Sequence, residues 1–171
     1  MSATGRSDVR HPLDAYQTPT WAIEAVLDAT GPWKGRTVLE PCAGDGNIAR
    51  ALASKGAIVT SSDIQWGVDF LDAEFTRYHW VVTNPPYVHA QAFATKAFSL
   101  ADGVIMLLRL GFLAGQKRHL WWQQHPPVGI YILSRRPSFT GKGTDSADYA
   151  WIMWRRGREM SGPGRTTVRW L

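Results

Sequence analysis

Residues 38–52, VLEPCAGDGNIARAL, join an apolar run, a pair of glycines and an amphipathic segment without a gap. The apolar run predicts a short buried strand, and the segment after the glycines predicts a helix with Ile48 and Leu52 facing inward. Gly44 and Gly46 lie at the turn between them, as in folds that bind nucleotide-like ligands where a strand leads into a helix. This unit predicts an α/β protein with a ligand site at the glycine turn.

The remaining sequence continues the alternation of strand and helix patterns. Thr18 and Pro19 predict a helix start, with the hydroxyl as the cap and proline in the first turn. Further helices are expected at 89–101 and 112–125, and further strands at 57–63, 78–84, 103–109, 129–134 and 149–155. The predicted fold is a single Rossmann-like, doubly wound, mostly parallel sheet with helices on both faces and an antiparallel edge strand near the C-terminus.

Composition bounds the class of protein. The chain has 171 residues with 44% hydrophobic residues, enough for one domain over residues 16–156, between a flexible segment 1–15 and a basic tail 157–171. No apolar run reaches the about 20 residues of a membrane helix, and the first residues have no apolar core of a secretory signal. The single cysteine, Cys42, fits a reducing cytoplasm, and the histidines show no metal-ligand spacing.

The charge is concentrated in the C-terminal third. Residues 135–171 hold eight basic and three acidic residues, which accounts for the whole formal net charge of +5. Such a basic region on a neutral body predicts a polyanionic partner, nucleic acid above all, although a solubilising tail would have the same composition.

Acidic residues at the glycine turn decide which ligand fits it. Glu40 and Asp45 would repel the pyrophosphate of a dinucleotide, which needs the helix N-terminus for itself. They would favour a cation, and S-adenosylmethionine carries an ammonium and a sulfonium but no phosphate. Asp63, at the end of the next strand, can accept hydrogen bonds from the ribose hydroxyls of that cofactor.

A second acidic residue adjoins an aromatic one in GVDFL, residues 67–71. Asp69 can accept a hydrogen bond from the exocyclic amine of adenine while the Phe70 ring lies against the purine. The alternative is that Phe70 belongs to the core and Asp69 caps a turn. The sequence leaves both open.

The motif Asn-Pro-Pro-Tyr at residues 84–87 follows the strand at 78–84. The side-chain carbonyl of Asn84 and the backbone carbonyl of Pro85 can accept both hydrogens of an aromatic amine, which favours a pyramidal nitrogen that attacks a methyl group. Pro86 stiffens the turn, and the Tyr87 ring can stack on a flat target.

The order of LEPCAGDG, SSDI, VDF and TNPPY resembles that of class I S-adenosylmethionine-dependent methyltransferases, and residues 16–155 fit the class. More narrowly, the chain resembles DNA adenine methyltransferases with the motif [DNS]-P-P-[YFW], of the small kind found in phages and prophages. The resemblance implies an S-adenosylmethionine-dependent enzyme that methylates the exocyclic amine of adenine in DNA.

The resemblance also implies roles for individual residues. Glu40 would bind the methionine ammonium, Asp63 the ribose and Asp69 the adenine amine. The other implied cofactor contacts are Tyr16, Thr18, Pro19, Pro41, Ala43, Gly44, Asp45, Gly46, Ile64, Phe70 and Asn84. The catalytic residues would be Asn84, Pro85, Pro86 and Tyr87.

The target side is less defined by sequence. Residues 110–134 are too short for a recognition region, which predicts a short or relaxed DNA site, or recognition by another protein. Candidate target contacts, besides Tyr87, are Arg135, Arg136, Phe139 and Lys142. The alternatives are methylation of a protein glutamine amide or an RNA base, a non-catalytic nucleic-acid-binding module on the same fold and, more distantly, a nicotinamide-dependent oxidoreductase. The oligomeric state is left open.

Overall fold

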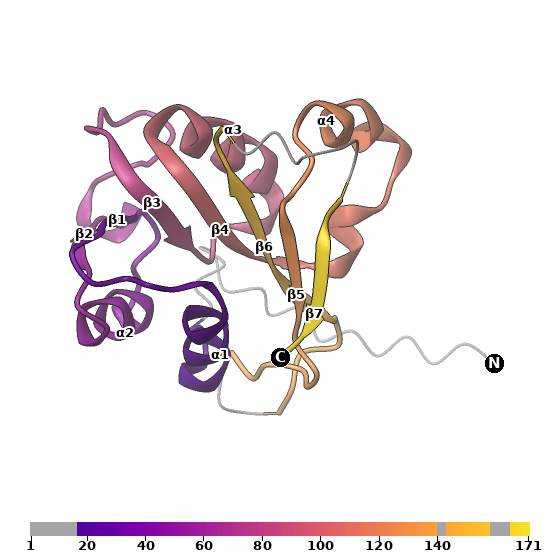
Figure 1. Ribbon diagram of the computed structural model, residues 1–171, viewed down its shortest axis with the longest axis horizontal. Coiled ribbons are helices and arrows are strands. Elements are labelled where there is room, and N and C mark those ends of the chain that lie inside the picture. The colour runs from indigo at the N-terminus through magenta and orange to yellow at the C-terminus, as the bar shows by residue number, and fades with distance from the viewer. Residues whose placement is uncertain (1–16, 140–142, 158–164) are drawn as a thin grey trace.

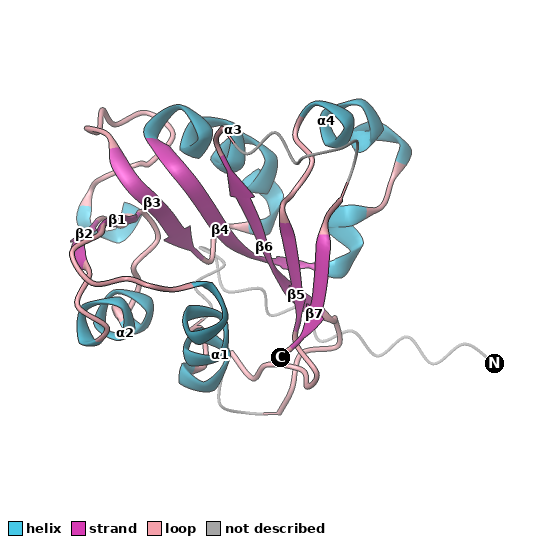
Figure 2. Ribbon diagram, viewed as in Figure 1, coloured by secondary structure: helices cyan, strands magenta, loops and turns pink. Residues whose placement is uncertain are grey.

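The computed structural model describes residues 17–139, 143–157 and 165–171. Within these residues a seven-stranded sheet is covered by helices on both faces (Figure 1). Tyr16 and Lys142, both predicted to contact a ligand, lie outside the described residues. The predicted α/β class and the mostly parallel, Rossmann-like sheet are confirmed (Figure 2).

The sheet has the strand order β2-β1-β3-β4-β6-β5-β7, and only the pairs that include β6 are antiparallel. The expected antiparallel strand near the C-terminus is therefore β6. In the strand order it is followed by β5 and then by β7, which forms the edge of the sheet. The strands are β1 (Thr37–Glu40), β2 (Ile58–Ser61), β3 (Tyr78–Thr83), β4 (Ala101–Arg109), β5 (Gly129–Ile132), β6 (Tyr149–Arg155) and β7 (Thr167–Trp170).

Two hydrophobic clusters fill the layers between the sheet and its helices. Leu27 of α1 (Thr20–Thr30) and Leu52 of α2 (Asn47–Ser54) pack in one cluster with Trp151 of β6. Phe93 of α3 (Ala90–Leu100) packs in the other with Met106 of β4, and the tryptophans of α4 (His119–Gln124) lie against this second cluster. The predicted inward positions of Ile48 and Leu52 are thus confirmed, and the other buried side chains of the first three helices include Ile23, Val26, Leu27, Phe93 and Ala97.

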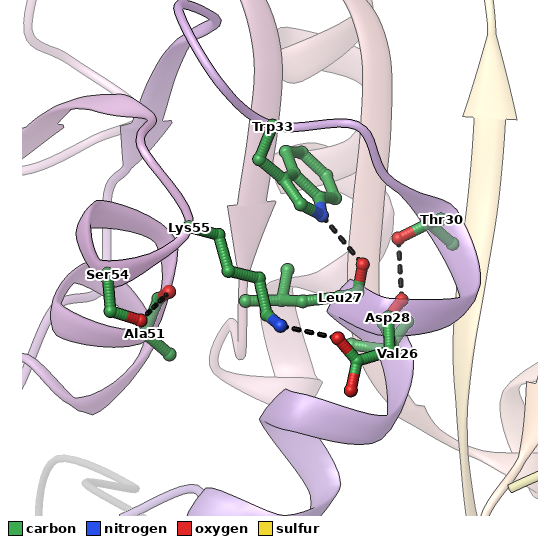
Figure 3. A network of polar contacts seen from close by, with 8 residues as sticks. All are labelled: Val26, Leu27, Asp28, Thr30, Trp33, Ala51, Ser54 and Lys55. Atoms are coloured by element: carbon green, nitrogen blue, oxygen red, sulfur yellow. Dashed lines mark hydrogen bonds and ion pairs between the residues drawn. The ribbon is translucent and has the colours of Figure 1, made fainter.

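Polar contacts fix α1 beside α2 (Figure 3). Trp33 lies just beyond the last turn of α1, and its indole donates to the carbonyl oxygen of Leu27 at 2.7 Å. Lys55, after the end of α2, pairs with Asp28 of α1. On the sheet side, the Trp151 indole donates to the carbonyl oxygen of Ala22 at 2.9 Å. The Lys55 pair ties α1 to the end of α2, and the Trp151 bond ties α1 to β6.

The predicted cap of α1 is wrong. Pro19 occupies the N-cap position, and no side chain caps the helix. The hydroxyl of Thr18 instead accepts a hydrogen bond from the side chain of Asn84 at 3.1 Å. Thr18, which the local pattern predicted as the helix cap, therefore contacts a residue 66 positions later in the sequence.

The predicted helix 112–125 is also wrong in its extent. The segment contains two short 3₁₀ turns, at Leu110–Leu113 and Gln116–Arg118, before the six-residue helix α4. Gly115 has φ +111°, a conformation that an α-helix cannot contain. The apolar spacing was correct for packing, since Phe112, Trp121 and Trp122 all reach the core, but glycine divides the segment.

Strand β7 was not predicted. It lies in the segment assigned to the basic tail and pairs in parallel with β5, with Val168 beside Ile130 and Trp170 beside Ile132. All four of its residues are exposed, so it has no buried apolar pattern for a sequence reading to detect. In the residues that the structure describes, no helix is both long and apolar enough to cross a membrane.

The strand order reverses direction at β1. From β1 the chain moves outward to β2 and then crosses back to β3 on the other side of β1. In open α/β sheets, ligands bind beyond the carboxyl ends of the strands at such a switch point. Glu40 ends β1 and Thr83 ends β3, so the fold predicts a ligand site at the segments that follow these two residues.

Candidate functional site

A pocket of about 480 Å³ opens at this switch point. It draws its walls from the residues before α1, the glycine turn after β1, the segments after β2 and the motif after β3. Predicted site residues that line it are Thr18, Pro41, Ala43, Gly44, Asp45, Asp63, Ile64, Asp69, Phe70, Asn84 and Pro86. Segments far apart in the sequence therefore meet at one cavity, as the switch-point rule requires.

The glycine turn exposes its backbone to the pocket. Gly44 and Gly46 have φ of +49° and +77°, conformations that favour glycine. A Cβ atom on Gly44 would meet no atom within 4 Å, so the space beside this backbone is open. The Gly44 amide donates to Asp63 Oδ2 at 2.8 Å, which ties the turn to the end of β2.

Asp63 is buried and both of its carboxylate oxygens accept backbone hydrogen bonds. Oδ2 accepts from Gly44 and Oδ1 accepts from the Gln65 amide at 2.8 Å. A carboxylate offers about four acceptor positions, so capacity remains for a ligand hydroxyl. The next residue, Ile64, has 54% of its surface exposed although it is apolar, and it lines the pocket.

The segment 69–71 has the capping and core contacts that the sequence offered as the structural alternative. Asp69 Oδ1 accepts from the Leu71 amide at 2.8 Å, so the carboxylate does cap a turn. Phe70 is 2% exposed, and its ring centroid lies 4.9 Å from that of Phe93, so it does belong to the core. Both residues nevertheless line the pocket.

Glu40 is fully buried beneath the glycine turn and does not line the pocket. Its Oε1 accepts from the Thr83 hydroxyl at 2.6 Å and from the Cys42 amide at 3.1 Å, which joins the ends of β1 and β3. Its Oε2 has no hydrogen-bond partner among the described residues. Burial raises the pKa of Glu40 to about 8, so the carboxyl is mostly protonated at neutral pH.

Asn84 follows β3 directly, and its amide is held from two sides. Nδ2 donates to the Thr18 hydroxyl at 3.1 Å, and Oδ1 accepts from the Tyr87 hydroxyl at 3.0 Å. One bond runs to the segment before α1 and the other stays within the motif. Asn84 lines the pocket, and these bonds distinguish the oxygen of its amide from the nitrogen.

Tyr87, the last residue of the motif, lies beside the end of β4 and the start of β6. The Arg109 guanidinium lies over its ring at 5.0 Å from the centroid, and the Tyr149 ring lies at 5.6 Å. The Tyr149 hydroxyl accepts from Arg109 Nε at 3.1 Å and donates to Asp145 Oδ2 at 2.9 Å. Burial raises the pKa of both tyrosines, that of Tyr149 to about 12, so both hydroxyls keep their protons at neutral pH.

Several predicted residues take other positions. Pro19, Gly46, Pro85 and Tyr87 do not line the pocket. Of the predicted target contacts, Arg135 lies over the Trp21 ring at 4.2 Å, Arg136 pairs with Asp148 at 2.8 Å, and Phe139 is buried against Tyr149.

Sequence reasoning missed part of the pocket and its surroundings. The additional lining residues are Gln17, Cys42, Asn47, Ile48, Gln65, Leu71, His89 and Phe93. Most adjoin a predicted residue, so the neighbourhood of each motif was the available signal. Burial raises the pKa of the Cys42 thiol, which makes it a neutral wall residue and not a nucleophile. Arg109 and Tyr149 have no local signal, because strand pairing brings them together.

Within the described ranges, no group of three or more histidine, cysteine, aspartate or glutamate side chains is placed to hold a metal ion. The cavity instead combines exposed backbone at the glycine turn with three carboxylates, apolar walls and the fixed amide of Asn84. This arrangement suits an organic ligand that has several hydroxyl or amine groups and a flat ring.

No model of a protein family matches the sequence, and no curated protein does. Solved structures do match. A candidate RNA methyltransferase from Pyrococcus horikoshii is 15% identical over 82% of this chain and 85% of that one, with a TM-score of 0.64. The methyltransferase subunit of a type I restriction-modification system from Streptococcus thermophilus is 14% identical over 85% of this chain and 46% of that one, with a TM-score of 0.59.

A third structure contains a cofactor. The magnesium protoporphyrin IX methyltransferase from Synechocystis PCC 6803, with S-adenosylmethionine bound, is 19% identical over 80% of this chain and 77% of that one, with a TM-score of 0.57. Likeness at these identities establishes the fold. The chain has the Rossmann-like fold of class I S-adenosylmethionine-dependent methyltransferases.

Proposed function

We propose that the protein is an S-adenosylmethionine-dependent methyltransferase that transfers a methyl group to the exocyclic amine of adenine in DNA. The observation that carries the proposal is the position of Asn84, which lines the same pocket as the glycine turn, Asp63 and Asp69. An acceptor for an aromatic amine therefore lies in one cavity with the groups suited to the cofactor. The fold, shared with methyltransferases, supports the same conclusion.

In the proposed complex, different residues bind different parts of the cofactor. Asp63 binds the ribose, Asp69 the adenine amine and Ile64 the purine face, while the glycine turn allows close approach. The Glu40 carboxyl lies beneath the turn with one oxygen unpaired and is proposed to bind the methionine ammonium. A cation beside Glu40 favours its ionised form, so cofactor binding releases a proton from a carboxyl whose pKa is about 8.

The proposed chemistry is a direct displacement at the methyl carbon. Asn84 Oδ1 and the Pro85 carbonyl accept the two hydrogens of the target amine, and the nitrogen lone pair attacks the methyl group along the line to its sulfur. When bound, S-adenosylmethionine would supply the methyl group and would be left as a neutral thioether, and the methylated amine would release its extra proton to solvent. The Arg109 guanidinium covers one face of the Tyr87 ring. In the proposed complex, a target base that stacks on this face displaces the guanidinium.

The test is transfer of a tritiated methyl group to unmethylated DNA, to RNA and to a translation release factor, followed by nucleoside and peptide analysis. The proposal predicts label on DNA, recovered as N6-methyldeoxyadenosine. Label on RNA or only on protein would keep the enzyme class and overturn the DNA substrate. No label on any of the three, from protein that also fails to bind S-adenosylmethionine, would overturn the enzyme class.

A further inference from the structure

Lys96 on α3 is bonded to the turn that carries Asp69, although Lys96 itself does not line the pocket. That turn is closed by its own backbone. The carbonyl oxygen of Asp69 accepts from the Asp72 amide at 3.2 Å and from the Ala73 amide at 2.8 Å. The Asp69 carboxylate accepts from the Leu71 amide at 2.8 Å. The direction of the carboxylate therefore depends on where Leu71 and Ala73 lie.

The Lys96 ammonium donates to the carbonyl oxygens of these same two residues. Its Nζ lies 2.9 Å from the oxygen of Leu71 and 2.6 Å from that of Ala73. Leu71 and Ala73 are thus held from both sides, by Asp69 at their amides and by Lys96 at their carbonyls. Hydrogen bonds from a charged donor are the stronger kind, so the ammonium restrains the whole turn.

The same ammonium also contacts the aromatic wall. Nζ lies 5.4 Å from the ring centroid of Phe70 and 5.9 Å from that of Phe75. Phe70 in turn packs on Phe93 of α3, and both rings line the pocket. One side chain therefore fixes the acceptor and the ring that the cofactor adenine is proposed to meet.

We propose that Lys96 is a positioning residue that makes the pocket specific for a 6-aminopurine, by holding the Asp69 carboxylate toward the amine. This inference rests on the proposed function, because it takes S-adenosylmethionine as the ligand. A lysine that merely stabilised α3 would affect every ligand of the pocket alike. A positioning lysine affects only those ligands that have the amine.

The experiment measures dissociation constants by calorimetry for two ligands, S-adenosylhomocysteine and its analogue with hydrogen in place of the 6-amino group. Wild type should bind S-adenosylhomocysteine more tightly than the analogue. Lys96→Met should raise the dissociation constant of S-adenosylhomocysteine by about tenfold, which corresponds to the loss of one well-placed hydrogen bond. It should raise the dissociation constant of the analogue by less than about threefold. Lys96→Arg, which keeps a charged donor, should restore most of the difference.

Lys55→Met is the matched control. Lys55 pairs with Asp28 on the opposite face of the sheet and touches no residue of the turn. It should leave both dissociation constants unchanged. In transfer assays, Lys96→Met should raise the KM for the cofactor and leave kcat at saturation close to wild type, since the motif at 84–87 is unaltered.

Equal weakening of both ligands by Lys96→Met, or no weakening of either, would overturn the inference, as would a wild type that does not distinguish them. If Lys96→Met does not fold, the same comparison on Lys96→Gln decides. A wild type that binds neither ligand would instead overturn the proposed function, so the two failures are distinguishable.

Discussion

At the scale of single residues, the proposed methyl transfer depends on how the Asn84 amide is oriented. A free amide can rotate by half a turn and exchange its oxygen with its nitrogen. Here the Thr18 hydroxyl binds one end and the Tyr87 hydroxyl the other, at 3.1 and 3.0 Å. Because the pKa of Tyr87 is raised by burial, its hydroxyl stays a donor and selects the oxygen as its partner. The acceptor that the chemistry needs is thereby fixed before the target arrives.

Tyr87→Phe tests this orientation. The change keeps the ring and removes the donor to Asn84 Oδ1, so the amide loses one of its restraints. We expect kcat for methyl transfer to fall by about tenfold, the cost of one hydrogen bond, with cofactor affinity within twofold of wild type because Tyr87 does not line the pocket. Steady-state kinetics and cofactor titration measure both. An unchanged kcat would mean that the hydroxyl does not orient the amide.

At the scale of elements, local patterns predicted the parts of the site and long-range pairing assembled them. The strands that end at Glu40 and Thr83 and the turns after them were predicted because apolar runs, glycines and prolines act locally. The unit formed by Arg109 and Tyr149 was missed, because the antiparallel register of β4 and β6 places these residues opposite each other. No pattern within either strand reports on that pairing.

The two errors of element prediction both arise where the backbone, and not the burial of side chains, decides the structure. The spacing of apolar residues in 112–125 suited a helix, but one glycine with positive φ divided it. Strand β7 has four exposed residues and owes its place to backbone pairing with β5, which leaves no trace in hydrophobicity. Sequence patterns report burial well and report backbone pairing poorly.

Gly103→Ala tests the packing of the central strands. Gly103 of β4 lies beside Trp80 of β3, and a Cβ atom there would come within 2.3 Å of the indole ring. The ring also packs on Trp33, with centroids 5.4 Å apart, so it cannot move freely. We expect a loss of about 1–3 kcal/mol in the free energy of unfolding, measured with urea.

The control for this change is Gly111→Ala. A Cβ atom at Gly111 would meet nothing within 4 Å, and its φ is not positive. We expect its free energy of unfolding to stay within about 0.5 kcal/mol of wild type. Similar losses in the two variants would show that the contact with Trp80 is not the cause.

At the scale of the whole molecule, Glu40 makes stability depend on pH. Its pKa rises from 4.5 to about 8 on folding, because burial disfavours the charged carboxylate. Below pH 4.5 both the folded and unfolded states hold the proton, and this contribution to stability is fully present. As pH rises from about 4.5 to 8, the unfolded state releases the proton and the folded state keeps it, so stability falls.

Glu40→Gln isolates this contribution. The variant is neutral at all pH values and keeps an oxygen that can accept from Thr83 and Cys42. Urea unfolding between pH 4.5 and 8 should show a decline in wild type that exceeds that of Glu40→Gln by a few kcal/mol, on the order of the pKa shift. Parallel curves for the two proteins would refute the assignment of the raised pKa to Glu40.

The role of Asn84 is tested most directly by measuring single-turnover methyl transfer to unmethylated DNA and cofactor affinity, each in wild type and in Asn84→Ala. If the amide acts on the target amine, transfer falls by about 10²- to 10³-fold, the usual cost of removing one group that stabilises a transition state, while the dissociation constant for S-adenosylmethionine stays within about threefold. Transfer by Asn84→Ala at a rate close to wild type would contradict the account.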